Sequence, residues 1–195
     1  MLGVAFCLGV LVAALVLRRR RRSWAAVGSM LGLRRGPFVA YVALLPFTLA
    51  TLGVLFAAGL YIAPDYFQSP PQASTLSGYA TMSPGVVSIL TVFAGELLLT
   101  ALGEELLFRG LIFGWLLERL EATAANVVQA VIFLAPHLLL LIAAPGLWWL
   151  VLIMGLGGGL ALGWVRQRTG SIWPGTLAHA IGNTTAADVV MVLAY

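Results

Sequence analysis

Long apolar segments separated by short polar ones run along the whole chain. Six of these segments are each close to the roughly 20 residues that cross a bilayer as a helix. They cover residues 2–17, 37–63, 85–118, 122–143, 147–165 and 174–195. Because apolar residues are continuous in them and do not alternate with polar ones, the pattern argues against an outer-membrane β-barrel. It predicts an all-α, polytopic transmembrane helix bundle of about six spans.

The composition leads to the same class of protein. Of 195 residues, 61% are hydrophobic and 9% are charged, and the mean hydropathy is +1.01. A soluble domain has about a quarter of its residues charged, and a chain of this size cannot bury so much apolar surface in its own core. A soluble globular protein and a disordered chain are therefore excluded. The single cysteine, Cys7, excludes an internal disulfide and a multi-cysteine metal site.

The arginines predict how the spans are oriented. All 11 basic residues are arginines, and all except Arg109 fall in alternate loops. These loop arginines are residues 18–22, 34–35, 119, 166 and 168. By the positive-inside rule these loops are cytoplasmic, so both termini face outside. Membrane topology thus accounts for the net charge of +4, and no nucleic-acid partner is expected.

The chain shows no internal repeat and no separate soluble domain. We expect residues 1–84 to form two N-terminal transmembrane helices with a cytoplasmic arginine-rich loop and an exterior loop. We expect residues 85–195 to form a four-helix core. In the fifth span Gly155, Gly159 and Gly163 recur every four residues, which predicts close contact with a neighbouring helix.

Polar and ionisable side chains are concentrated in three of the spans. A charged side chain in hydrocarbon costs about 2.5–3.5 kcal/mol on insertion scales, so such groups pair or line an interior cavity. The third span carries Glu96, Thr100, Glu104, Glu105 and Arg109; the fourth Asn126, Gln129 and His137; the sixth His179, Asn183, Thr184, Thr185 and Asp188. Their restriction to three helices predicts one shared site.

Helical spacing separates the two adjacent glutamates. Glu105 and Arg109 are four residues apart, so they share a face and pair. Glu104 points about 100° away around the helix, has no cation at helical spacing, and is therefore a candidate for general acid–base chemistry. His179 and Asn183 are also four apart, and two neutral donors on one face suit the stabilisation of an oxyanion.

Other interpretations of the same residues remain open at this point. The two histidines are also the kind of side chain that hydrogen-bonds one helix to another. Glu104, Glu105, His137 and His179 are plausible ligands for zinc or iron. The sequence has no HExxH or ExxH spacing, however, so we predict no metal and no other cofactor.

Three motifs occur in order on the third, fourth and sixth spans: EExxxR at 104–109, FxxxH at 133–137 and HxxxN at 179–183. Together they resemble the CPBP family of intramembrane proteases, which includes type II CAAX prenyl endopeptidases and bacterial Abi-type proteins. The resemblance covers residues 85 to about 188.

The resemblance implies a function and a mechanism. Glu104 and His137 would activate water, and His179 and Asn183 would hold the oxyanion of the tetrahedral intermediate. The protein would be an intramembrane endopeptidase that cleaves a peptide or protein substrate near the cytoplasmic leaflet. We expect it in contact with membrane lipid, in the cytoplasmic membrane of a bacterium.

The resemblance also implies that Glu105 and Arg109 pair to orient the site. Two other functions compete with proteolysis. The first is a non-catalytic bacteriocin-immunity or membrane scaffold protein of the same fold, in which the polar side chains only hold helices together. The second is a small transporter using Glu96 and Glu104, which the absence of an inverted repeat disfavours.

The predicted depths of the two histidines do not match. At 1.5 Å per residue, His179 lies roughly 8 Å and His137 roughly 20 Å from the cytoplasmic ends of their spans. A protruding cytoplasmic end of the third span would leave Glu104 at a shallow depth. A kink at Pro136 would bring His137 nearer; otherwise the boundaries of the fourth span are different.

Overall fold

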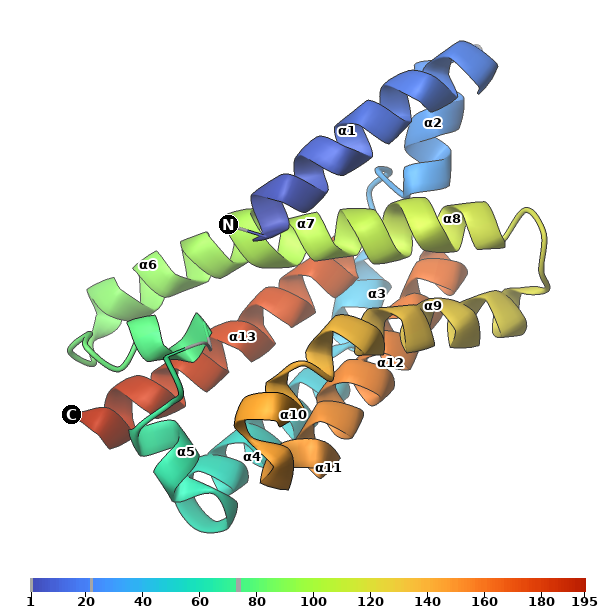
Figure 1. Cartoon of the computed structure of the whole chain (residues 1–195). Helices are drawn as coiled ribbons and strands as arrows, with labels where there is room; N and C mark the ends of the chain where they lie inside the picture. Colours follow the sequence, from blue (N-terminus) through green and yellow to red (C-terminus); the bar gives the residue numbers. More distant parts are fainter. Residues whose placement is uncertain (1, 22, 73–74) are drawn as a thin grey trace.

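The computed structural model describes residues 2–21, 23–72 and 75–195 (Figure 1). Over these residues the chain is helical, and its one β-type contact is an isolated bridge between Leu33 and Ser171. Four helices are long and apolar enough to cross a membrane: Phe38–Ile62, Val86–Leu116, Pro145–Thr169 and Trp173–Ala194. The all-α class of an integral membrane protein is therefore confirmed, whereas the count of about six spans and the exterior termini stay predictions.

The remaining helices are shorter or more polar at their ends. They are α1 (Leu2–Arg21), α2 (Trp24–Leu31), α5 (Pro64–Gln68), α9 (Ala122–His137) and α10 (Leu140–Ala143). The long helices consist of α3 (Phe38–Ala43) and α4 (Leu45–Ala57); α6 (Val86–Gly95), α7 (Leu102–Glu105) and α8 (Phe113–Leu116); α11 (Trp148–Val151) and α12 (Gly158–Thr169); and α13 (Trp173–Ala194).

The helix formed by α6, α7 and α8 is interrupted twice by π-helical turns. The turns cover Glu96–Ala101 and Leu106–Ile112, so they lie on either side of the short α7 segment that ends in two glutamates. A π turn widens the helix and rotates the side chains that follow it, and such turns are frequent at functional sites. Glu96, Glu104 and Glu105 all face α13, where they contact Asn183 or His179.

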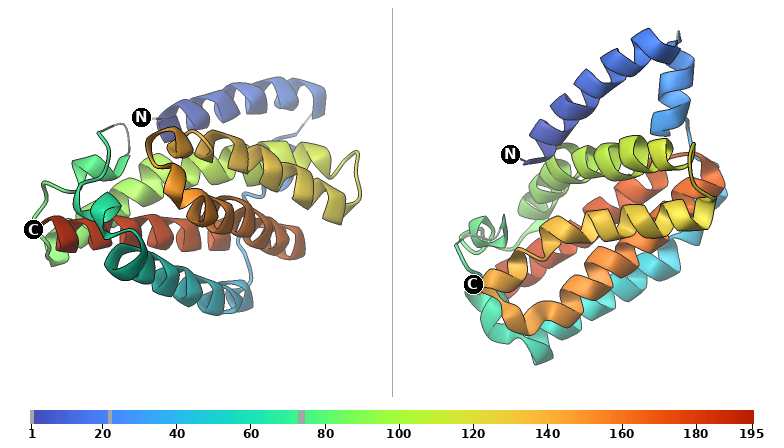
Figure 2. Two further views of the ribbon diagram at one scale, coloured as in Figure 1. Left: turned by 60° about the horizontal axis from the view of Figure 1, so that its bottom comes forward. Right: turned by 45° about the vertical axis from the view of Figure 1, so that its right-hand side comes forward.

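The bundle places this long helix between an outer hairpin and an inner layer. Figure 2 shows α1 and α2 on its outer side, away from α4 and α12. The backbones of α1 and the long helix approach so closely at Gly3 and Gly103 that neither position has room for a Cβ atom. On the inner side α12 packs against both α9 and α13, and α13 packs against the first π turn of the long helix (Figure 1).

The glycines of the fifth span pack against α9, as the sequence predicts. A Cβ at Gly155 would lie 2.8 Å from Leu134 Cδ1, and one at Gly159 would lie 3.1 Å from Ala130 Cβ. Side chains larger than hydrogen would push the two helices apart. The close contact sets the position of α9, and with it the position of His137 at its end.

Two arginines connect the N-terminal hairpin to the core. Gly32 ends α2 and Gly170 ends α12, with φ of 72° and 67°, which glycine adopts without strain. Arg166 Nη2 of α12 donates to the Met30 carbonyl of α2 at 2.8 Å, and Arg34 Nε donates to the Gly170 carbonyl at 3.1 Å. Arg166 of α12 thus satisfies a carbonyl group in the last turn of α2, and Arg34, which follows α2, satisfies the carbonyl group of the residue that ends α12.

The loops that carry arginine lie at one end of the bundle. Figures 1 and 2 show the α1–α2, α2–α3, α8–α9 and α12–α13 connections there, whereas α5 and the C-terminus are at the opposite end. Arg22, the last residue of the first arginine run, is outside the described residues. This arrangement is the one that the alternate-loop pattern of arginines predicts, although no membrane fixes which end is cytoplasmic.

Candidate active site

A buried ion pair lies in the middle of the site. Arg109 Nη1 is 2.9 Å from Glu105 Oε1, and both side chains are almost completely inaccessible to solvent. The pair confirms the interaction predicted from their spacing of four residues. Because an isolated charge is very costly in such surroundings, each residue is required to make the other tolerable.

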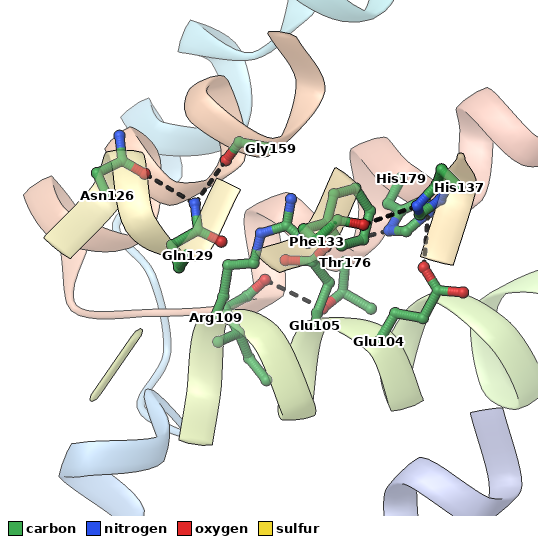
Figure 3. A network of polar contacts seen from close by, with 11 residues as sticks. Glu104, Glu105, Arg109, Asn126, Gln129, Phe133, His137, Gly159, Thr176 and His179 are labelled. Atoms are coloured by element: carbon green, nitrogen blue, oxygen red, sulfur yellow. Dashed lines mark hydrogen bonds and ion pairs between the residues drawn. The ribbon is translucent and has the colours of Figure 1, made fainter. Parts of the chain in front are cut away.

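His179 of α13 contacts both glutamates of α7. Its Nδ1 is 3.1 Å from Glu105 Oε1, and its Nε2 is 3.7 Å from Glu104 Oε2 (Figure 3). Glu105 is an acceptor because it is paired with Arg109, so Nδ1 of His179 carries a proton and donates it to Glu105. The other nitrogen, Nε2, faces Glu104. The histidine beside Glu104 thus comes from α13. Helical spacing within α7 cannot predict this contact, because it relates only residues of the same helix.

The second imidazole is held by the backbone of its own helix. His137 Nδ1 donates to the Phe133 carbonyl at 2.8 Å, which leaves Nε2 available to accept a proton in the neutral ring. The Phe133 ring contacts both histidines, with centroid distances of 4.5 Å to His137 and 6.0 Å to His179. Its face also lies 4.0 Å from Arg109 Cζ. Phe133, which the sequence marks only as the first letter of a motif, thus supports three side chains of the site.

Asn183 lies on the same face of α13 as His179 and is bonded to a third glutamate. Its Nδ2 donates to Glu96 Oε2 at 2.9 Å. Tyr79, from the segment that precedes α6, donates its hydroxyl to Glu96 Oε1 at 2.5 Å. The sequence places Glu96 among the polar residues of the third span, but it gives no signal for the contact with Tyr79 because the two belong to different elements.

A cavity of about 190 Å³ adjoins these groups. Its polar wall is formed by His137, His179 and Asn183. The rest of its lining is largely apolar and comes from α4, α9, α12 with the preceding π turn, and α13: Phe47, Thr51, Leu55, Phe133, Met154, Gly158, Leu162, Ala178, Gly182 and Ala186. A small, mostly apolar cavity with a few convergent polar groups is the usual form of a ligand or substrate site.

The arrangement of the helix ends explains how the two histidines meet. In both Figure 1 and the left view of Figure 2, the hairpin between α8 and α9 projects beyond the turn between α12 and α13. His137 is therefore far from the start of α9 and yet level with His179, which is near the start of α13. Pro136 lies inside the last turn of α9, one residue before that helix ends.

The polar residues of α9 do not all belong to this site. Gln129 Nε2 donates to the Gly159 carbonyl and to Asn126 Oδ1, each at 2.8 Å, and Asn126 Nδ2 donates to the Leu160 carbonyl at 3.0 Å (Figure 3). These bonds connect α9 to α12. The single shared site expected from the sequence is thus accompanied by a second, separate polar network. Among the described residues no group of three or more His, Cys, Asp or Glu is arranged to hold a metal ion.

These features define an integral membrane protein with ionisable side chains gathered beside a cavity inside the bundle. Residues 86–185 match the family model described as type II CAAX prenyl endopeptidase Rce1-like. The chain belongs to this family. The match contains α6 to α12 and most of α13, and it leaves out α1 to α5. No curated protein and no solved structure matches the chain. Family membership indicates an intramembrane endopeptidase that acts on a peptide substrate.

Proposed function

We propose that the protein hydrolyses a peptide bond near the cytoplasmic leaflet, with water activated by Glu104 and His137 and the oxyanion bound by His179 and Asn183. The observation that carries the proposal is the convergence of these groups. Two histidines and an asparagine from two helices line one cavity of about 190 Å³, and a carboxylate of a third helix lies 3.7 Å from one of those histidines.

Glu104 is the group best suited to take a proton from water. Its Oε2 has no hydrogen-bond partner, and its side chain retains 17% exposure, in contrast to the fully enclosed Glu105. A water that donates one hydrogen to Glu104 has His137 Nε2 as a second acceptor. Two acceptors orient the water so that a lone pair of its oxygen is directed at the substrate carbonyl.

The reaction then proceeds by ordinary acyl chemistry. As the water oxygen bonds to the carbonyl carbon, one of its protons moves to Glu104 and the carbonyl π electrons become a lone pair on the oxyanion. When the C–N bond breaks, Glu104 returns that proton to the departing nitrogen. The products are a carboxylic acid and an amine, and Glu104 is again a carboxylate.

The oxyanion is expected to accept hydrogen bonds from α13. One N–H of Asn183 Nδ2 is used by Glu96, so the other is available to the substrate. His179 uses its Nδ1 proton for Glu105, so it donates from Nε2 only as the imidazolium. The adjacent carboxylates of Glu104 and Glu105 stabilise that positive charge, and the Oε1 atom of Glu105 is shared between His179 and Arg109.

The lining of the cavity supports a substrate with an apolar side chain next to the cleaved bond. We infer a bacterial cytoplasmic membrane as the location, because the basic residues are all arginine and all except Arg109 fall in alternate loops. The chemistry described above uses no metal.

The decisive experiment is turnover of a fluorescence-quenched peptide by the purified protein in nanodiscs. Two probes are used: a farnesylated CAAX peptide and the same peptide without the farnesyl group. We expect cleavage of at least one probe and a loss of about 10³-fold in kcat for Glu104→Gln with an unchanged unfolding temperature. The matched control is Glu121→Gln, which alters an exposed glutamate outside the bundle interior and should retain full activity.

Two results would contradict the mechanism. The first is unchanged turnover by Glu104→Gln, which would favour the scaffold function for this polar cluster. The second is complete loss of turnover on addition of a chelator that is reversed by zinc, which would replace the glutamate base by a metal centre.

A further inference from the structure

Glu96 is a buried carboxylate outside the proposed catalytic set. It begins the π turn Glu96–Ala101 and is only 6% exposed. Both of its oxygens have a partner: Tyr79 donates to Oε1 and Asn183 donates to Oε2. With two donors and no acceptor around it, the carboxylate is bound in its ionised form. A buried charge in a membrane protein is costly, so its retention needs a reason beyond helix packing.

The partner of Glu96 gives that reason. A primary amide has an acceptor on one side and donors on the other, so Asn183 has two orientations related by a flip. An ionised carboxylate only accepts hydrogen bonds. The flipped amide would direct Asn183 Oδ1 at Glu96 Oε2, which replaces an attraction by a repulsion. Glu96 therefore selects the orientation in which Nδ2, with its second N–H, is presented by α13.

Tyr79 holds the carboxylate in place from the opposite side. It lies just after the 3₁₀ turn Thr75–Gly78, in the connection between α5 and α6. Burial and the neighbouring Glu96 carboxylate raise the pKa of the Tyr79 phenol, so that it remains a donor throughout the neutral range. Its ring is also packed against the apolar clusters around Val92 and Val190. The loop segment is thus attached to the bundle through the same carboxylate that orients Asn183.

We propose that Glu96 and Tyr79 are positioning residues for the hydrolysis, and that they fix the amide of Asn183 with one N–H directed at the oxyanion. This inference rests on the proposed function, specifically on Asn183 as an oxyanion donor. It makes Tyr79, and with it the connection between α5 and α6, part of the catalytic apparatus.

A double-mutant cycle separates this role from a purely structural one. We would measure kcat and KM for Glu96→Gln, Tyr79→Phe and Asn183→Ala, and for each of the first two combined with Asn183→Ala. Loss of one oxyanion donor costs about 10²–10³-fold in kcat, which is the expectation for Asn183→Ala. Glu96→Gln allows the amide to flip and should lower kcat about 10–100-fold, with KM within about twofold. Tyr79→Phe removes one neutral hydrogen bond and should lower kcat about 3–10-fold.

The informative value is the effect of Glu96→Gln in the Asn183→Ala background. We expect less than about a twofold further loss there, because no amide remains to be oriented. Matched controls are Glu121→Gln and Tyr61→Phe, which change exposed residues and should leave kcat unaltered. If Glu96→Gln does not fold, Tyr79→Phe completes the same cycle.

Other outcomes would contradict either the positioning role of Glu96 and Tyr79 or the oxyanion role of Asn183. If the losses multiply in the double variants, or if Glu96→Gln has the wild-type kcat while Asn183→Ala is slow, the positioning role is wrong and the proposed mechanism stands. If Asn183→Ala retains the wild-type kcat, the oxyanion role of Asn183 is wrong and the positioning role is lost with it.

Discussion

The molecule contains two buried polar networks that differ in what their side chains bond to. In the network between α9 and α12, Asn126 and Gln129 donate mainly to backbone carbonyls of the neighbouring helix. In the cluster around α7, Glu105, Arg109 and His179 bond to one another as side chains. The first network connects helices, whereas the second holds ionisable groups at the edge of a cavity.

The difference shows that polarity within a membrane span does not by itself indicate chemistry. Both networks contain a buried oxygen without a hydrogen-bond partner, Gln129 Oε1 in one and Glu104 Oε2 in the other. Gln129 does not line the cavity of about 190 Å³, and it cannot exchange a proton near neutral pH. Glu104 is beside a histidine that does line it, and it is an acid. Unused acceptor capacity next to a cavity, rather than burial of a polar group, distinguishes the candidate site.

The largest expected effect on this comparison comes from breaking the buried ion pair. Arg109→Met removes the cation and leaves Glu105 buried with only His179 as partner, which should lower the free energy of unfolding by about 3–5 kcal/mol. The double variant Glu105→Gln/Arg109→Met removes both charges and should recover most of that loss. We expect kcat to stay low in the double variant, because there His179 has lost the carboxylate that orients it.

Unfolding in detergent and turnover of the peptide probe measure the two effects separately. Equal destabilisation in the single and the double variant would show that the Glu105 charge is not what makes the single variant unstable. Full activity in the double variant would remove Glu105 from the site and assign the pair to helix packing alone.

The sequence predicts the features that depend on residues near each other along one helix. The pairing of Glu105 with Arg109, the shared face of His179 and Asn183, and the small-residue face of the fifth span all follow from helical spacing. The all-helical membrane class follows from the length of the apolar runs. The order of the three motifs leads to the family whose model matches the chain.

Contacts between elements distant in the sequence could not be obtained in this way. Helical spacing places Glu96, Thr100 and Glu104 on one stripe. Glu96 and Glu104 do both contact α13, but at Thr100, inside the π turn that begins at Glu96, the backbone packs against α1. The bond from Tyr79 to Glu96 joins a loop to a helix, and the contact of Arg166 with α2 joins two helices. No single-helix periodicity contains such pairings, because they depend on how the helices cross.

A larger side chain where α9 and α12 cross should disturb the network between these two helices and leave peptide hydrolysis unchanged. In Gly163→Ala the new Cβ would collide with the side-chain amides of Asn126 and Gln129. Overpacking of this kind should lower the free energy of unfolding by about 1–3 kcal/mol. The kcat of the folded fraction is expected to stay within about twofold of the wild type, since His137, at the other end of α9, keeps its contacts.

Gly157→Ala is the matched control for this variant. It makes the same chemical change in the same span, at a position where a Cβ meets nothing within 4 Å. We expect no loss of stability there. If both alanine variants are equally unstable, the effect comes from the helix backbone and the close contact at Gly163 does not contribute.

The smallest expected effect tests the comparison most directly. Gln129→Leu keeps a side chain of similar size and removes the hydrogen bonds to Gly159 and Asn126. Interhelical hydrogen bonds in membrane proteins contribute about 0.6 kcal/mol on average, so the stability should fall by about that amount. The kcat should not change, because neither Gln129 nor its partners line the cavity. Unfolding and peptide turnover are measured in parallel on this variant. A drop in kcat of more than about tenfold at unchanged stability would show that the two networks act as one functional unit. The distinction between a network that only connects α9 to α12 and one that serves hydrolysis would then be wrong.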